Sequence, residues 1–122
     1  MNNKILGNLG ENIASEYLKN SGYKIIKKNF KCKIGEIDII AKYKNTIYFI
    51  EVKTRTSIKY GVPAESVNFY KQARIIKVAQ FYLSQNPIFD NLPIGFDVIE
   101  IYINKNNYEF IKINHIKDAF TL

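Results

Sequence analysis

Residues 35–55 read GEIDIIAKYKNTIYFIEVKTR, in which two apolar runs are separated by a short polar break. Residues 34–41 and 46–54 are rich in isoleucine and aromatic side chains, a composition typical of β-strands. The break at residues 42–45 is short, so an antiparallel hairpin is the simplest way to join the two strands. Both strands also carry charged residues among the apolar ones, and these residues are the first candidates for a functional site.

The sequence around this hairpin predicts one earlier strand, two helices and two later strands. Apolar residues recur at helical spacing over residues 8–20, and Gly22 follows them as a helix terminator. The other expected elements are a strand over residues 23–30, a loop over 57–63, a helix over 64–84, strands over 94–103 and 108–113, and a short helical or irregular tail. The order α-β-β-β-α-β-β predicts an α/β fold, with a central mixed sheet flanked by helices.

Length and composition are those of an ordinary globular chain. We expect one domain over residues 1–122, with 47% hydrophobic and 24% charged residues. No apolar run approaches the length of a membrane span, and the N-terminal residues lack the apolar segment of a signal peptide. We therefore expect a cytoplasmic protein without a membrane partner. Cys32 is the single cysteine, which excludes an internal disulfide and a multi-cysteine zinc site.

The chain is basic, with 18 Lys and Arg against 11 Asp and Glu and a formal net charge of +7. An excess of this kind favours a polyanionic partner, and nucleic acid is the first candidate. We expect Arg55, Lys71 and Arg74 to contact phosphates. A solvated basic face is the alternative for these residues, and the abundance of Lys, Asn and Ile, which A/T-rich codons specify, offers a compositional origin for part of the charge.

Alternation of side chains along the hairpin brings three charged residues within reach of one another. Glu51 and Lys53 share one face of the second strand, while Asp38 lies on the opposite face of the first strand from Ile37 and Ile39. Neighbours on one face lie roughly 6.6 Å apart along a strand. If the charged faces of the two strands coincide, Asp38, Glu51 and Lys53 converge on one patch.

Two carboxylates and a lysine suit a divalent-metal site that hydrolyses phosphodiesters. Mg²⁺ or Mn²⁺ prefers carboxylate, carbonyl and water oxygens, so Asp38, Glu51 and the backbone carbonyl of Val52 are the expected ligands. The metal would acidify a bound water, and Lys53 would orient that water or neutralise developing charge. The alternative is a cross-strand ion pair, although a carboxylate among isoleucines needs a partner that a metal would supply.

Three further residues each have two interpretations. Glu11 lies at the edge of the apolar stripe of the first helix, where it could turn toward the site as a metal or water ligand or remain a surface carboxylate. Asp97, within the strand over residues 94–103, is expected to be a structural partner of a nearby basic residue rather than a catalytic group. His115 is expected to be a surface residue or a hydrogen-bonded structural histidine.

The chain resembles the YraN family of bacterial proteins over most of its length. The matching positions fall in ordered blocks: Gly7, Gly10-Glu11 and Ala14; Gly22-Tyr23; Asn29-Phe30; residues 35–40; residues 49–55; Gly61, Pro63 and Lys71; and Phe96-Asp97-Val98. This resemblance implies a restriction-endonuclease-like core of the PD-(D/E)XK group, similar to archaeal Holliday-junction resolvases. The metal site of that group maps onto Asp38, Glu51 and Lys53, and Glu11 maps onto its helix-borne acid. Gly95 departs from the family pattern, which often has an arginine before Phe-Asp.

These observations predict a divalent-metal-dependent nuclease that hydrolyses DNA phosphodiesters, with branched or damaged DNA as candidate substrates. The alternatives are a non-catalytic nucleic-acid-binding module and an assembly factor, each retaining the nuclease fold. A chain of 122 residues has little room for its own target-recognition element, so we also expect a homodimer or a protein partner.

Overall fold

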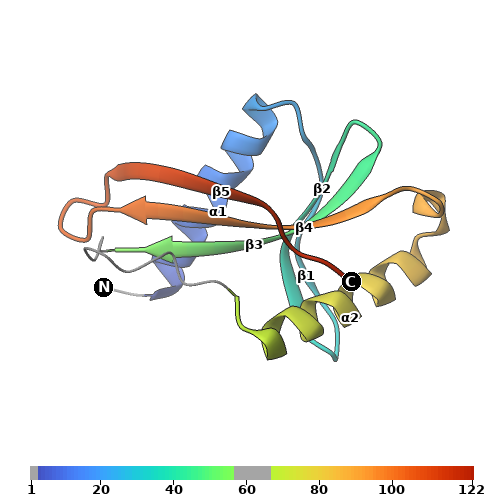
Figure 1. Ribbon diagram of the computed structural model, residues 1–122. Helices are drawn as coiled ribbons and strands as arrows, with labels where there is room; N and C mark the ends of the chain where they lie inside the picture. The colour runs from blue at the N-terminus through green and yellow to red at the C-terminus, as the bar shows by residue number, and fades with distance from the viewer. Residues whose placement is uncertain (1–2, 57–66) are drawn as a thin grey trace.

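The computed structural model describes residues 3–56 and 67–122, which form a five-stranded sheet with helices packed on it (Figure 1). The elements are α1 (Asn3–Asn20), β1 (Lys24–Lys31), β2 (Glu36–Tyr43), β3 (Thr46–Arg55), α2 (Phe69–Gln85), the short 3-10 helix η1 (Pro87–Phe89), β4 (Ile94–Ile103) and β5 (Phe110–Phe120). The strands lie in the order β1-β2-β3-β4-β5; β3 and β4 are parallel, and the other neighbours are antiparallel. The α/β class, the element order and the mixed sheet of a restriction-endonuclease-like core are thus confirmed.

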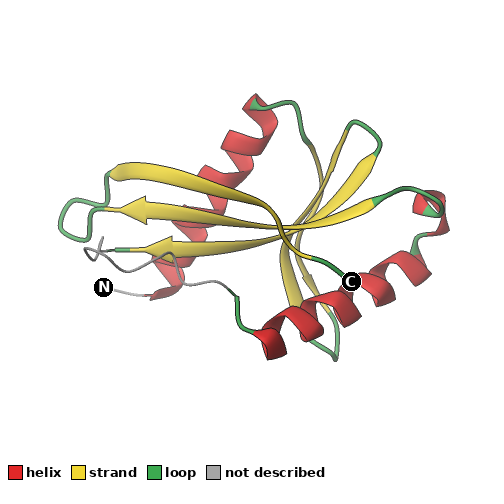
Figure 2. Ribbon diagram, viewed as in Figure 1, coloured by secondary structure: helices red, strands yellow, loops and turns green. Residues whose placement is uncertain are grey.

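The two long helices cover opposite faces of the sheet (Figure 2). On one face, Val78 and Tyr82 of α2 pack in a cluster with Phe49 of β3. On the other face, Ala14 and Leu18 of α1 pack in a second cluster with sheet residues. Burying a large apolar side chain stabilises a fold by about 1.5–3 kcal/mol, so these two clusters hold both helices against the sheet. Within the described residues, no helix is long and apolar enough to cross a membrane.

The sheet divides between β2 and β3, and we call this place the fork. The antiparallel ladder between these strands begins next to the turn and has Ile39↔Ile50 as its last pair. Beyond that pair β2 continues beside β1, while β3 continues beside β4. In Figure 1 the β1–β2 pair accordingly runs across the direction of β3, β4 and β5. Beyond the fork, this edge of β3 is therefore no longer paired with β2.

Strict alternation of faces along β2 proved wrong at the fork. Ile37 packs in the α2-side cluster together with Ile40, whereas Ile39 packs in the α1-side cluster. Two residues of the same parity thus contribute to opposite sides, because β2 turns away from β3 at Asp38. Along β3 the expected alternation is confirmed, since Phe49 lies in the α2-side cluster and Ile50 in the other.

Gly10 allows α1 to lie directly against β3. A Cβ atom at position 10 would overlap the side chain of Thr54. A glycine here lets the helix backbone approach the strand more closely than any larger residue would. The next residue in the helix is Glu11, so this close approach also sets the distance between Glu11 and the fork.

Both helices begin at different residues from those predicted. α1 starts at Asn3 instead of residue 8. α2 starts at Phe69 instead of residue 64, because the side chain of Asn68 accepts a hydrogen bond from the Lys71 N–H and caps the helix there. The predicted loop over residues 57–63, with Gly61 and Pro63, and the first residues of the predicted helix lie outside the described residues.

The prediction of a helical or irregular tail after residue 113 was wrong, because β5 continues to Phe120. Ile113, Ile116 and Ala119 are spaced three residues apart, which resembles a helical period. In the structure a register shift in the β4–β5 ladder and a positive φ of 49° at Asp118 interrupt the alternation of the strand. A bulged strand of this kind can bury apolar residues at odd spacing.

Candidate active site at the fork

Asp38 lies at the fork, where its side chain replaces a backbone hydrogen-bond partner that β2 would otherwise give to β3. Its side chain is 8% exposed, and its Oδ2 accepts a 2.8 Å hydrogen bond from the backbone N–H of Val52. A buried backbone N–H needs a partner, and here a carboxylate replaces the carbonyl of a neighbouring strand. Asp38 is thus fixed against β3, next to Glu51.

The carboxyl groups of Asp38 and Glu51 meet in this small space. Burial raises the pKa of Asp38 to about 8, and the negative charge of Glu51 adds to the rise, while the Val52 N–H opposes it. A hydrogen bond between the two side chains also favours the protonated form of Asp38. Two carboxyls so placed retain a proton between them unless a cation takes its place. The fork is therefore a place that attracts positive charge.

Val52 offers a backbone oxygen on the same side. Its N–H points to the edge of β3 that Asp38 covers. In an extended strand the N–H and C=O of one residue point to the same edge, as the paired hydrogen bonds of antiparallel ladders require. The carbonyl of Val52 therefore faces the fork, as a ligand from this residue would need to.

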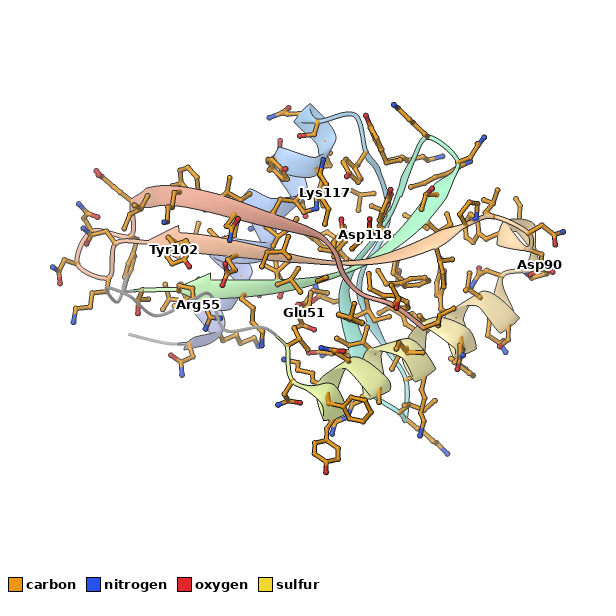
Figure 3. All side chains as sticks on the ribbon, in the orientation of Figure 1. Glu51, Arg55, Asp90, Tyr102, Lys117 and Asp118 are labelled. Atoms are coloured by element: carbon orange, nitrogen blue, oxygen red, sulfur yellow. The ribbon has the colours of Figure 1, made fainter. Side chains whose placement is uncertain are left out.

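Two lysines converge on Glu51 from different elements. Lys71, in the first turn of α2, places its Nζ 3.4 Å from Glu51 Oε1, and the Glu51 side chain is only 12% exposed. Figure 3 shows Glu51 on the side of β3 that faces the start of α2. Burial lowers the pKa of Lys53, and its neighbour Lys71 lowers it further against the pull of Glu51. For Lys71 burial acts in the same direction, but contacts with Lys53 and Glu51 outweigh it and raise the pKa.

Glu11 lies at the margin of the fork. The pKa of Glu11 is raised, mainly by burial and also by the charges of Glu36 and Glu51. A hydrogen bond with the Asn29 side chain and the charge of Lys28 oppose this rise. Glu11 in turn raises the pKa of Asp38. It is thus within electrostatic reach of the carboxyl pair. In residues 3–56 and 67–122, however, no group of three or more His, Cys, Asp or Glu side chains is arranged to hold a metal ion.

The three residues that were expected to contact phosphates, Arg55, Lys71 and Arg74, lie in different surroundings. Arg55 forms an ion pair with Glu100, with 3.4 Å between Nη2 and Oε2, and Asn114 donates a 2.8 Å hydrogen bond to the same buried carboxylate. Lys71 is engaged with Glu51, as described above. Arg74 is exposed, and its side chain lies over the backbone of Gly35.

Glu100 was missed by sequence reasoning, although a signal for it was present. It stands in the apolar run of β4 and lies beside Lys53 in the parallel ladder with β3. A carboxylate in such a run is fully buried only when it has partners. The pairing of Arg55 with Glu100 makes this arginine an anchor between the two strands.

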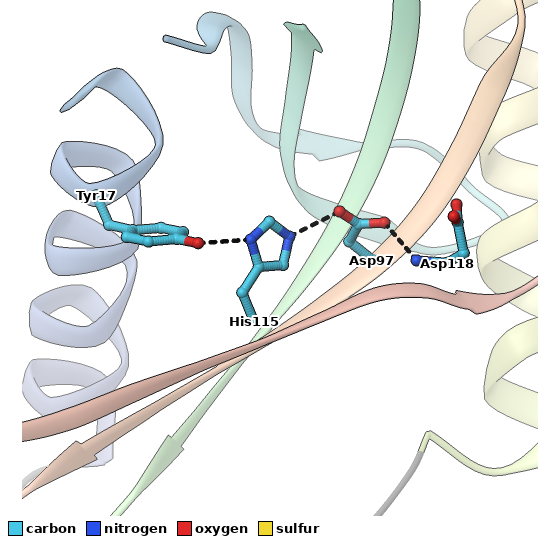
Figure 4. Close-up of polar contacts among 4 residues, drawn as sticks. All are labelled: Tyr17, Asp97, His115 and Asp118. Atoms are coloured by element: carbon cyan, nitrogen blue, oxygen red, sulfur yellow. Dashed lines mark hydrogen bonds and ion pairs between the residues drawn. The ribbon is translucent and has the colours of Figure 1, made fainter. Parts of the chain in front are cut away.

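Asp97 and His115 form a separate polar chain on the α1 side of the sheet (Figure 4). His115 Nε2 lies 2.7 Å from Asp97 Oδ2, and its Nδ1 lies 2.8 Å from the hydroxyl oxygen of Tyr17. The other oxygen of Asp97 accepts a 3.0 Å hydrogen bond from the N–H of Asp118. The expectations of a structural partner for Asp97 and of a hydrogen-bonded structural His115 are confirmed.

At Gly95, where the family pattern often has an arginine, a Cβ atom would lie 2.8 Å from the ring of Tyr48. The Tyr48 ring thus occupies the space that a side chain at position 95 would need.

The fold and the fork define an α/β protein with a restriction-endonuclease-like core and a carboxyl–lysine cluster where its central strands diverge. Comparison with known proteins gives the family. Residues 10–101 match the model of the uncharacterised protein family UPF0102, and the chain belongs to this family. UPF0102 is the YraN family, so the family predicted from the sequence blocks is confirmed.

Several relatives match almost the whole chain. A UPF0102 protein of Caldanaerobacter subterraneus subsp. tengcongensis is 52% identical over 98% of both chains. A UPF0102 protein of Caldicellulosiruptor bescii is 53% identical over 98% of this chain and 100% of its own. A UPF0102 protein of Clostridioides difficile is 51% identical over the same shares.

Proposed function

We propose that this protein is a divalent-metal-dependent nuclease that hydrolyses DNA phosphodiesters at the fork. The observation that carries the proposal is the meeting of two carboxyl groups, Asp38 and Glu51, next to Lys53 where the central strands diverge. This edge of β3 is no longer paired with β2, and the Asp38 side chain lies against it. The net charge of +7 supports a polyanionic substrate.

The oxygen donors at the fork fit Mg²⁺ or Mn²⁺. Asp38 and Glu51 supply hard carboxylate oxygens, and Val52 supplies a carbonyl that faces the same edge. The proton and the Lys71 ammonium that now balance the carboxyl pair are the charges that a cation would replace. When bound, the metal supplies an acidified water and neutralises charge on the phosphate.

The remaining side chains have roles that follow from their surroundings. Lys53 loses its proton more readily than an ordinary lysine, so it can accept a proton from the attacking water or donate one to the leaving oxygen. We assign to Glu11 the orientation of the water, because its charge acts on Asp38. Lys71 orients Glu51 from α2.

Cleavage assays with matched variants test this proposal. Purified protein is incubated with single-stranded, duplex, forked and four-way DNA in Mg²⁺ or Mn²⁺, and products are resolved on denaturing gels. Asp38→Asn, Glu51→Gln and Lys53→Met should each lower the rate at least about 100-fold. Glu16→Gln is the control, because Glu16 is an exposed carboxylate of α1 whose ion-pair partner is Lys19.

Equal cleavage by all variants would show that the activity belongs elsewhere. DNA binding that weakens steeply with salt, without cleavage under any metal condition, would instead establish a nucleic-acid-binding module. Binding of Mn²⁺, followed by titration calorimetry, separates a site that holds metal without cutting from one that holds none.

A further inference from the structure

The outward face of α2 begins with two aromatic side chains that are largely exposed to solvent. Phe69 is 76% exposed and Tyr70 is 81% exposed. Their rings lie edge to face, with centroids 6.1 Å apart and an interplanar angle of 77°. Large aromatic residues at the start of a helix usually face a core, so a pair of them in solvent indicates a binding role.

Basic residues continue this surface along the helix. Tyr70, Arg74, Lys77 and Phe81 are separated by four, three and four residues, so they share one side of α2. All four are exposed; Phe81 is 40% exposed, and its ring also stacks with Phe30 of β1. With Phe69 they form what we call the aromatic–basic strip, which is roughly 16 Å long from Tyr70 to Phe81 because each helical residue rises 1.5 Å.

The aromatic end of the strip lies next to the fork. Lys71 follows Tyr70 directly in the chain and reaches Glu51 at 3.4 Å. The Asn68 cap fixes this first turn of the helix. Arg74, one turn further along, lies over Gly35 at the end of the β1–β2 hairpin. A ligand lying along the strip would therefore pass beside the helical turn from which Lys71 reaches the candidate active site.

We propose that the aromatic–basic strip binds an unpaired DNA strand, whose bases stack on Phe69 and Tyr70 while its phosphates contact Arg74 and Lys77. Stacking rings interleaved with cations are what single strands require, since the rings take the bases and the cations take the backbone. Duplex bases are already stacked on one another and cannot reach such rings. Cations between the aromatic residues also disfavour an apolar protein surface as the occupant. For cleavage, this inference rests on the proposed nuclease function. The substrate class of that nuclease is then DNA with a single-stranded segment at the cut.

Fluorescence anisotropy with two labelled oligonucleotides tests the strip without requiring cleavage. One probe is a single strand of about 15 thymidines, and the other is an abasic strand of the same length, both in EDTA. Phe69→Ala combined with Tyr70→Ala should weaken thymidine binding at least about 10-fold and leave abasic binding within twofold. Tyr70→Phe is the matched control and should preserve binding. Arg74→Ala should weaken both probes and reduce the dependence of log K on log salt by about 0.7.

The outcomes separate this inference from the nuclease assignment. If the double variant binds both probes as the wild type does, or loses both equally, the strip does not stack bases, whatever the cleavage assay shows. Selective loss of thymidine binding supports the strip even if the protein cuts nothing. A change of molar mass in light scattering on mutating Phe69 and Tyr70 would show that a second copy covers the rings, and would overturn the inference. Circular dichroism confirms that these exposed substitutions leave the fold intact.

Discussion

Replacing Asp38 by Asn should make the metal-free protein more stable while removing the proposed activity. In the folded protein, burial and the charge of Glu51 raise the pKa of Asp38 from 3.8 to about 8. An unfolded chain releases this proton near pH 3.8, whereas the folded chain retains it to about pH 8. Stability is therefore lost as the pH rises from about 4 through about 8. An asparagine, which has no proton to lose, avoids this loss.

The size of the effect follows from the same values. Each unit of pKa difference corresponds to 1.36 kcal/mol, so the interval between 3.8 and pH 7 amounts to at most about 4 kcal/mol. The amide oxygen of asparagine can still accept the hydrogen bond of the Val52 N–H, and its NH₂ group can donate to Glu51. The free energy of unfolding at pH 7 should thus rise by up to about 4 kcal/mol in Asp38→Asn.

Urea denaturation followed by circular dichroism in EDTA measures this difference at pH 5, 7 and 9. The gap between Asp38→Asn and wild type should grow with pH, while Glu16→Gln follows the wild type. Excess Mn²⁺ should stabilise the wild type, by about 2.7 kcal/mol at a hundredfold excess over its dissociation constant, and leave Asp38→Asn unchanged. An Asp38→Asn protein that is no more stable than wild type at pH 7, with the same pH dependence, would refute the account of the carboxyl pair.

Four further predictions concern the scaffold. Gly10→Val should lower the free energy of unfolding by about 1–3 kcal/mol, because a larger side chain forces α1 away from β3. Gly7→Ala should raise the free energy of unfolding by about 0.5–1 kcal/mol, because nothing lies near a Cβ atom at this position. Thermal melting compares the two variants. Asn68→Ala removes the cap of α2 and should cost about 1 kcal/mol in urea denaturation. His115→Ala leaves the buried carboxylate of Asp97 without its ring partner, and should cost about 3 kcal/mol by the same measurement.

The hairpin and the faces of β3 could be predicted from the sequence because both depend on local pattern. Apolar runs with a short polar break define antiparallel strands, and Glu51 shares a face with Phe49 whatever the surrounding fold. The strand over residues 94–103 has the predicted bounds. Local pattern also explains the error at the tail, since a bulge shifts side chains between faces and the resulting three-residue spacing resembles a helical period.

The fork could not be predicted in this way, because it depends on where one strand leaves another. Nothing in the order of residues 36–55 indicates that the β2–β3 ladder ends at Ile39↔Ile50. The partners of Lys71 and Arg55 were missed for the same reason. Each lies on a different element from its carboxylate, so the pairing depends on how α2 and β4 pack on β3.

The divergence of the strands and the chemistry of the site meet at Asp38. If β2 continued beside β3, a backbone carbonyl of β2 would accept the hydrogen bond of the Val52 N–H. The Val52 carbonyl would then be paired with a backbone N–H of β2. Instead a carboxylate takes that hydrogen bond, which leaves the Val52 carbonyl facing the gap and brings Asp38 against Glu51. The protein thus gives up ladder hydrogen bonds and buries a carboxyl at a cost in stability. A buried carboxyl with a raised pKa, as at Asp38, is expected of a site maintained for binding rather than of a cross-strand ion pair maintained for stability.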